Sequence, residues 1–382
     1  MFTLDVAMPI ALFSVLIVAL FLNKRTEGKL SATVEEREFK SRDIIVLVIF
    51  MAIAVSGLAL AAIYTPGSLF LDVILVFFLF SYTLLLFTFS YVFSGIKTAK
   101  AQLISIGFGV VSVIVAIACT AAPLIDSFTI LRVGAFIGLA VFCFGVVAYA
   151  RTSTTNKERW YVAAQPPAMF VLLFVFFNFL SNNGTAAVWS LFLVDVFALT
   201  FGVLIILYLS PMFNWKTVGL FAVLLTTMDI VLVIGSTAML TAAKSFSGLG
   251  LPVLVVLPNI PITAQISSVT HVSTIVFRGL GLGDYFFAGV LAVQTSKKFG
   301  MKIAIVAAAA MAISFGIWEG FLQDIINGLI PIVGRNIGGW PATTCMLTGW
   351  APVIGIALLL GKAKKPTVNQ STVAPKEQAV SA

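Results

Sequence analysis

The sequence predicts an all-α protein built as a bundle of transmembrane helices. Of its 382 residues 60% are apolar and only 10% are charged, and the mean hydropathy is +1.10. Ordinary soluble domains carry about 25% charged residues. Because no soluble fold of this length could bury so much apolar surface, part of that surface must face lipid. We therefore expect a polytopic membrane protein with about nine to eleven spans.

Apolar runs long enough to cross a bilayer recur along the chain. A hydrocarbon core about 30 Å thick is crossed by about 20 helical residues. Eleven runs are suitable: 6–22, 44–64, 68–94, 101–121, 128–149, 162–180, 187–209, 216–242, 272–295, 301–322 and 343–361. A polar stretch at 23–43 predicts a cytoplasmic linker between the first two spans. The chain thus divides into N-terminal helices at 1–215, a core at 216–365 and a polar, disordered cytoplasmic tail at 366–382.

The apolar segment 248–262 does not fit a further span. It contains Pro252, Pro258 and Pro261, and proline interrupts helices. A span there would also place the basic residues that follow on opposite sides of the membrane. We interpret the segment as a re-entrant or interfacial loop with strand-like backbone.

Lysine and arginine residues predict the orientation of the chain. Nineteen of the 23 lie in alternate connections and the C-terminal tail, and four lie near helix ends on the other side. Basic residues are enriched in cytoplasmic loops. The pattern therefore predicts an N-terminus outside and a C-terminus in the cytoplasm. Because the positive charge of +8 is spread over these loops, it does not indicate nucleic-acid binding.

Metal sites and disulfides are not expected. The three cysteines all lie in apolar runs, no Cys-x-x-Cys motif occurs, and His271 is the one histidine. We expect no cofactor.

Acidic residues inside the predicted spans are the strongest functional signal. An ionised carboxylate at membrane depth costs at least about 2.5 kcal/mol. Asp195, Asp229 and Asp284 lie well inside spans, whereas Asp72 and Glu319 lie near outer helix ends, where water or headgroups can solvate them. For Asp195, we expect a buried polar partner such as Ser, Thr or Arg.

Two of these aspartates could form a catalytic pair if their helices are neighbours. Close carboxylates cannot both ionise easily, so they share one proton. The ionised carboxylate can then take a proton from water, while the neutral one polarises a peptide carbonyl. Spacing alone equally allows a proton- or cation-coupled transporter, in which Asp195, Asp229 and Asp284 bind the coupling ion.

The surroundings of both aspartates resemble the presenilin and signal peptide peptidase family of intramembrane aspartyl proteases. Gly281-Leu282-Gly283-Asp284 matches the Gly-x-Gly-Asp motif of that family. The segment that follows Asp229 is similar to signal peptide peptidase at Asp229-Ile230, Val233, Gly235-Ser236, Met239 and Ala243-Lys244-Ser245-Phe246. Pro341-Ala342-Thr343 corresponds to the Pro-Ala-Leu motif of the last helix. The match covers roughly 216–361.

The resemblance implies an intramembrane aspartyl endopeptidase with Asp229 and Asp284 as catalytic residues. It implies supporting or substrate-binding roles for Gly281, Leu282, Gly283, Pro341, Ala342 and Thr343. Two departures are visible: Met228 replaces the tyrosine that precedes the first aspartate, and Thr343 replaces the leucine of the last motif. They keep open a third possibility, a catalytically silent relative that acts as a scaffold.

The predicted orientation matches signal peptide peptidases rather than presenilins. Substrates would be transmembrane segments of type II orientation, such as remnant signal peptides, and the surrounding partners would be membrane lipids. We expect segment 248–262 and the stretch before Asp284 to pair with an unwound substrate. The backbone of Pro341, Ala342 and Thr343 would hold its other side, with the Pro341 carbonyl as an acceptor. The chain ends Ala-Val-Ser-Ala without an endoplasmic-reticulum retrieval signal, which favours a microbial cell membrane over the endoplasmic reticulum.

Overall fold

A computed structural model describes ten stretches of the chain. They are residues 5–30, 38–64, 98–121, 129–152, 191–235, 252–260, 264–266, 273–275, 277–334 and 339–361. The described part is mostly helical. Its helices are α1 (Ala7–Leu30), α2 (Ser41–Tyr64), α4 (Thr98–Ala121), α5 (Thr129–Thr152), α9 (Leu191–Leu209), α10 (Trp215–Ile230), α12 (Leu282–Phe299), α13 (Met301–Gly320), α14 (Leu322–Val333) and α15 (Ala342–Leu359).

Five of the described helical segments are long and apolar enough to cross a membrane. They are Ala7–Arg25, Val194–Met212, Trp215–Gly235, Met301–Gly320 and Ala342–Leu359. By length and composition the protein is therefore a membrane-embedded helical bundle, as the sequence predicts. The predicted spans 68–94 and 162–180 lie outside the described residues.

The expectation of an all-α chain is wrong around the second aspartate. The span predicted at 272–295 begins as a helix only at Leu282, because residues before it form the strands β3 (Ser273–Ile275) and β4 (Phe277–Gly281). Strand β4 pairs antiparallel with β1 (Leu254–Pro258), and β3 pairs with β2 (Ala264–Ile266). The strand-like backbone expected at 248–262 is thus confirmed in β1. Two glycines and a β-branched run favour extended backbone over helix here.

Two further boundaries differ from the prediction. The linker expected at 23–43 is shorter, because α1 continues to Leu30 and α2 begins at Ser41. Apolarity does not mark a helix end, and the polar residues from Asn23 onward extend the helix beyond its apolar stretch. Helix α14 was not predicted. It is short and contains Pro331, and a single residue, Phe321, separates it from the end of α13.

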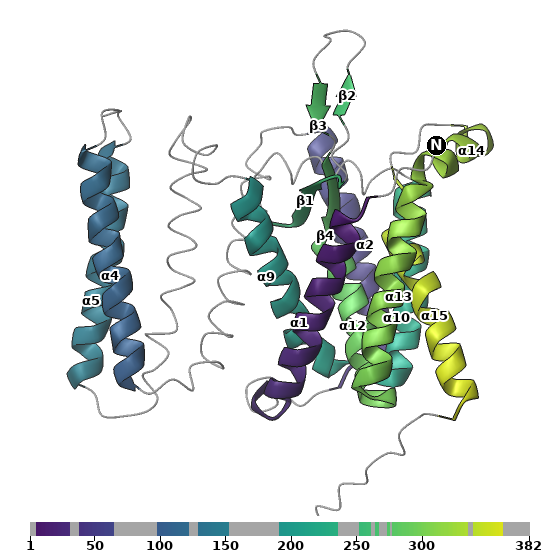
Figure 1. Cartoon of the computed structure of the whole chain (residues 1–382), viewed down its shortest axis with the longest axis horizontal. Helices are drawn as coiled ribbons and strands as arrows, with labels where there is room; N and C mark the ends of the chain where they lie inside the picture. Colours follow the sequence, from purple (N-terminus) through teal and green to yellow (C-terminus); the bar gives the residue numbers. More distant parts are fainter. Residues whose placement is uncertain are drawn as a thin grey trace, which may run out of the picture.

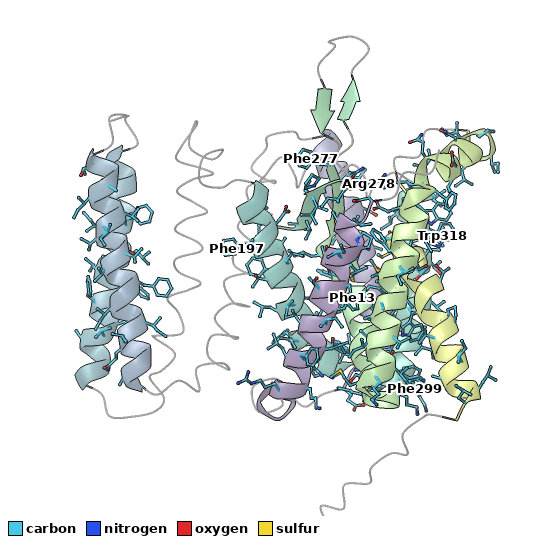
Figure 2. The ribbon with its side chains drawn as sticks, viewed as in Figure 1. Phe13, Phe197, Phe277, Arg278, Phe299 and Trp318 are labelled. Atoms are coloured by element: carbon cyan, nitrogen blue, oxygen red, sulfur yellow. The ribbon has the colours of Figure 1, made fainter. Side chains whose placement is uncertain are left out.

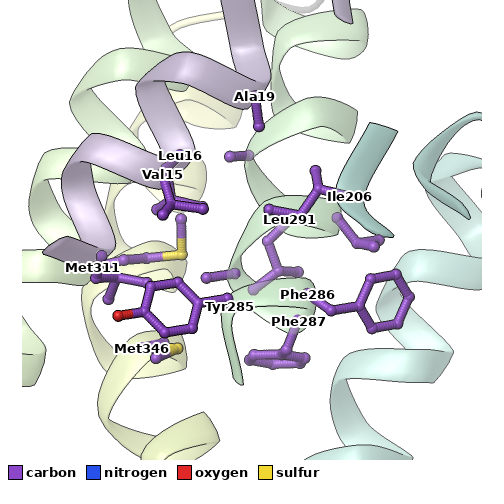
Figure 3. Close-up of a cluster of buried hydrophobic side chains, with 14 of the residues drawn as sticks. Val15, Leu16, Ala19, Ile206, Tyr285, Phe286, Phe287, Leu291, Met311 and Met346 are labelled. Carbon is purple, nitrogen blue, oxygen red and sulfur yellow. The ribbon is translucent and has the colours of Figure 1, made fainter. Parts of the chain in front are cut away.

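Helix α12 lies at the centre of the bundle. Its side chains are buried continuously from Tyr285 to Thr295, as expected for a helix surrounded by others. Helices α1, α9, α10, α13 and α15 all contact it (Figure 1). Figure 3 shows Val15, Leu16 and Ala19 of α1 facing the buried side chains of α12. Helices α4 and α5 pack against each other as a pair.

Small residues let neighbouring helices approach closely. A Cβ at Gly349 of α15 would collide with the backbone carbonyl of Ala310 in α13, and one at Gly289 of α12 would collide with Ile206 of α9. Such contacts are a usual way to pack membrane helices, because lipid provides no hydrophobic drive for their association. They fix the helices that surround the two aspartates.

Candidate active site

Helix α10 carries Asp229 near its C-terminal end. The helix begins with a capping box: the Asn214 side chain accepts from the Thr217 N–H at 3.0 Å, and the Thr217 hydroxyl accepts from the Asn214 N–H at 2.9 Å. Asp229 is 4% exposed. A π-helical turn, Val231–Gly235, follows the α-helix directly. Such turns are rare and are frequent at functional sites.

Asp284 lies in the first turn of α12, where β4 ends. Gly281 is the N-cap residue, so Asp284 is the third helical residue, and its carboxylate accepts a hydrogen bond from the Gly281 N–H. This is the returning half of a capping box. A Cβ at Gly281 would lie 3.2 Å from Asp284 Oδ2. The Gly-x-Gly-Asp spacing therefore has a local cause, because the carboxylate folds back over a residue that has no side chain.

Thr343 connects the last helix to Asp229. Its hydroxyl donates to Asp229 Oδ2 at 2.7 Å, and its backbone N–H approaches the same oxygen at 3.4 Å. Thr343 is the second residue of α15, so this N–H belongs to a helix N-terminus with no intrahelical acceptor. Asp229 thus receives two donors from the segment that the sequence singled out.

The two carboxylates interact electrostatically with each other. The helices that carry them are antiparallel neighbours: Asp284 lies near the start of α12 and Asp229 near the end of α10, while Gln294 further along α12 contacts the turn before α10. We refer to Asp229 and Asp284 as the aspartate pair. The two carboxylates are thus close enough for their charges to interact, and their pairing in acid–base chemistry stays a prediction.

Buried polar contacts fix the three helices that bear the site. Gln294 Nε2 donates to the carbonyls of Ser210 at 2.8 Å and Phe213 at 2.7 Å. The Trp350 indole donates to the Thr295 hydroxyl at 2.9 Å, which ties α15 to α12. Buried polar groups left without partners are costly, so each contact restricts the register of its helices.

The other predicted site residues have distinct surroundings. Leu282 is buried, and its N–H donates to the Val253 carbonyl at 2.9 Å, which extends the strand pairing toward the aspartate pair. Gly283 is exposed, and nothing lies within 4 Å of the position of a Cβ. A methyl group at Gly283 would therefore contact no neighbouring helix of the described residues.

Pro341 and Ala342 begin α15. Pro341 is the N-cap, and its carbonyl accepts a hydrogen bond from the Cys345 thiol at 3.5 Å. The N-cap carbonyl is the first acceptor of a helix. This carbonyl is directed into α15, and its role as an acceptor for substrate stays a prediction.

Asp195 has a partner that differs from the one expected. Its Oδ1 accepts from the backbone N–H of Val256 in β1 at 2.7 Å, and the residue is 4% exposed. Asp195 thus bonds backbone rather than Ser, Thr or Arg. Tyr285, which follows Asp284 in the sequence, is buried, with its hydroxyl 3.6 Å from Met8 Sδ. Figure 3 shows its ring near Met311 and Met346.

Arg278 and Glu319 form an ion pair at the same end of the bundle as β4. Arg278 Nη1 lies 3.1 Å from Glu319 Oε1 and also donates to the Glu319 carbonyl at 3.3 Å. Figure 2 shows Arg278 at this end and Phe299 at the opposite end. The expectation that Glu319 is simply solvated at a helix end is wrong, because its side chain is 14% exposed and paired.

Sequence reasoning missed the role of Asp5. It is 1% exposed, and its Oδ1 accepts from the N–H groups of Ala7 and Ile260, both at 3.0 Å. An Asp two residues before a helical run is a recognisable capping signal. His271 and Asp72 lie outside the described residues.

A metal centre is not formed by the part of the chain that the structure describes, where no three His, Cys, Asp or Glu residues gather in a suitable group. Comparison of the chain with models of known protein families gives no match, and comparison with curated proteins gives none either.

Proposed function

We propose that the protein is an intramembrane aspartyl endopeptidase and that the aspartate pair is its catalytic centre. The observation that carries this proposal is the meeting of two carboxylates from antiparallel helices inside an apolar bundle. Burying two acidic side chains in such surroundings is costly. A pair that shares one proton reduces this cost and holds both a base and an acid, which are the two groups that peptide hydrolysis needs.

The chemistry follows from this shared proton. The ionised aspartate removes a proton from a water molecule, whose oxygen bonds to the carbonyl carbon of the peptide. The neutral aspartate donates its proton to the carbonyl oxygen, which gives a tetrahedral diol. Collapse of the diol breaks the C–N bond, and a proton returned from the pair leaves with the amine. Peptide and water become an acid and an amine, and the pair is regenerated with one proton.

Helix N-termini support the negative charge of the aspartate pair. Asp284 lies in the first turn of α12, and Asp229 accepts from the second residue of α15. Each N-terminus carries partial positive charge from unpaired N–H groups. Two such ends that meet at one pair stabilise a single anion where water is scarce.

Strand β4 is the proposed docking edge for an unwound substrate. Within the described residues its sheet has two strands, so β1 covers one edge of β4. The other edge of β1 is bonded at Val256 by the Asp195 side chain, and Asp5 bonds the N–H of Ile260, two residues beyond the end of β1. A substrate strand would therefore add to β4, which leads directly to Asp284. Its hydrogen bonds would replace those lost when a transmembrane helix unwinds.

The proposed substrate class rests on the predicted orientation, and the location is part of the same proposal. An outside N-terminus and a cytoplasmic C-terminus favour type II segments such as remnant signal peptides, and we propose a microbial cell membrane as the site of action. The resemblance to signal peptide peptidases supports this choice. Reporters fused to each terminus test the orientation.

Cleavage of a membrane-embedded reporter tests the proposal. In liposomes of purified protein, Asp229→Ala and Asp284→Ala should each abolish cleavage while membrane insertion is retained. The matched control is Asp195→Asn, which keeps an oxygen that accepts from Val256 and should retain cleavage. A transporter that uses all three aspartates would lose its function in all three variants. Cleavage that survives in both Ala variants would remove the proposal.

Crosslinking of a hydroxyl-containing transition-state mimic separates the remaining alternative. A protease should be labelled at the site, and the label should disappear in Asp229→Ala and Asp284→Ala. A catalytically silent scaffold would show no labelling that depends on the aspartates.

A further inference from the structure

We infer that Thr343 decides which member of the aspartate pair carries the charge: Asp229 is the ionised base and Asp284 holds the proton. This inference rests on the proposed function for its catalytic consequence. Its structural content, a hydroxyl that stabilises one carboxylate of two, can be measured without catalysis. Thr343 is in this view a positioning residue that acts through Asp229.

The donors around Asp229 favour its charged form. The Thr343 hydroxyl is 2.7 Å from Oδ2, a short distance typical of a hydroxyl that donates to a carboxylate. The Thr343 N–H adds a second, longer contact to the same oxygen and brings the N-terminus of α15 toward it. Because Thr343 is 2% exposed, water has little access to replace its hydroxyl. Asp229 therefore depends on Thr343 for these donors.

Fewer hydrogen-bond donors stabilise the charged form of Asp284. It accepts from the Gly281 N–H of its own capping turn. It has no counterpart of the Thr343 hydroxyl among the hydrogen bonds of the described residues. When only one of two close carboxylates can ionise, the one with more donors takes the charge. The proton then remains with Asp284, which faces the end of the proposed docking strand.

Other ionisable groups near Asp229 do not reverse this assignment. The Cys345 thiol of α15 interacts with both aspartates, more with Asp284 than with Asp229, and a thiol carries no charge that would move the proton. Helix α2 also packs on α10, and its ionisable side chains are Arg42 and Asp43 in the first turn and Tyr64 at the last residue. On α10 itself, Lys216 lies more than three helical turns before Asp229.

The assignment gives each residue a step. Asp229 takes the proton from water as the water oxygen attacks, and Asp284 donates its proton to the substrate carbonyl. A chain with leucine in place of Thr343 would retain the N–H contact but not the hydroxyl. The division of roles would then rest on other groups.

Three variants isolate the hydroxyl. Thr343→Val removes it with little change of shape, and Thr343→Ser restores it. Thr344→Val is the matched control, because the Thr344 hydroxyl is buried and has no hydrogen-bond partner among the described residues. Each variant is compared with the full-length wild-type protein by the pH dependence of kcat for the reporter. The neutral-carboxyl C=O band is also titrated by infrared spectroscopy.

Thr343→Val should move the acidic limb of the kcat profile to higher pH by about one unit, because a charged carboxylate loses one donor. The infrared difference between wild type and Thr343→Val should show a carboxyl that stays neutral to a similarly higher pH. Thr343→Ser and Thr344→Val should both coincide with wild type.

Coincident titrations of wild type and Thr343→Val would overturn the inference, whether or not the protein cleaves its reporter. An infrared shift in a protein that cleaves nothing would support the role of Thr343 and count against the protease. A kcat loss in Thr343→Val without any shift of the profile or the band would assign Thr343 a packing role, which also overturns the inference.

Discussion

Asp195 in α9 accepts a hydrogen bond from the Val256 N–H in β1 at 2.7 Å, so a membrane helix holds the outer edge of the sheet that leads to Asp284. Val256 is the register partner of Gly279 in β4. The carboxylate therefore fixes β1, β1 fixes β4, and β4 ends where the capping turn of Asp284 begins. Asp195 thus influences the position of Asp284 through the backbone of β1 and β4.

Replacement of Asp195 by Val should destabilise the protein. It leaves the Val256 N–H without an acceptor in an apolar region, which costs about 1–3 kcal/mol. Asp195→Asn should stay close to wild type, because an amide oxygen can accept the same bond. Unfolding in detergent can be followed with a thiol-reactive dye, since Cys143 and Cys345 are free and buried. Equal unfolding temperatures for the Val and Asn variants would contradict this role.

Gly281→Ala should impair cleavage more than it impairs folding. The new Cβ would lie 3.2 Å from Asp284 Oδ2, so the carboxylate must move by a few tenths of an ångström. Small misplacements of a catalytic group are costly, and we expect a fall in kcat of about tenfold or more. The backbone at Gly281 is extended, with φ −71° and ψ 148°, so alanine itself causes no strain.

Gly283→Ala is the comparison for this prediction. Nothing lies within 4 Å of its Cβ position, and alanine favours the helix more than glycine does. Its unfolding temperature should therefore equal or exceed that of wild type. Gly281→Ala should lower kcat clearly but lower the unfolding temperature, measured with the same dye, only slightly. Unchanged kcat would show that Asp284 is not held by this close approach.

The two aspartates and most helices of the described part could be predicted from the sequence, because both signals are local. Apolar runs of sufficient length predicted α10, α13 and α15. Carboxylates within such runs are costly enough to stand out. Glycines mark the change from strand to helix at Gly281, yet the residues before it were assigned to a helix, because length and apolarity do not separate strand from helix.

The contacts that build the site could not be predicted, because they join distant segments. Asp195 and Val256 are 61 residues apart, and Asp229 and Thr343 are 114 apart. In the sequence Thr343 is a departure from a motif. Its hydroxyl reaches Asp229 only when α15 packs against α10. The same holds for Glu319, whose partner Arg278 lies on a strand that was predicted as helix.

Gly349→Ala should strongly destabilise the contact between α13 and α15. A Cβ there would collide with the Ala310 carbonyl, which is backbone and cannot rotate away. Overpacking of this kind costs about 1–3 kcal/mol. Gly355→Ala in the same helix is the control, because its Cβ would meet nothing within 4 Å. Gly349→Ala should unfold at lower temperature than wild type, and Gly355→Ala should not. Equal stability of both variants would show that α15 packs differently.

The ion pair between Arg278 and Glu319 should stabilise the folded protein. The side chains are 18% and 14% exposed, so water screens the charges incompletely. Removing one partner leaves the other without its counter-charge, which is the main cost when such pairs are broken. Arg278→Gln and Glu319→Gln should therefore each lower the free energy of unfolding, whereas the double variant should lose less than the sum of the two.

A double-mutant cycle measures this coupling. We expect about 1–2 kcal/mol between the two residues, with both glutamines present as the reference state. The pair joins β4 to the end of α13, so its loss should also loosen the proposed docking strand and raise the KM for the reporter more than it lowers kcat. Additive effects on stability would mean that the charges contribute independently. A lower kcat at unchanged KM would place their influence at the aspartate pair instead of at β4.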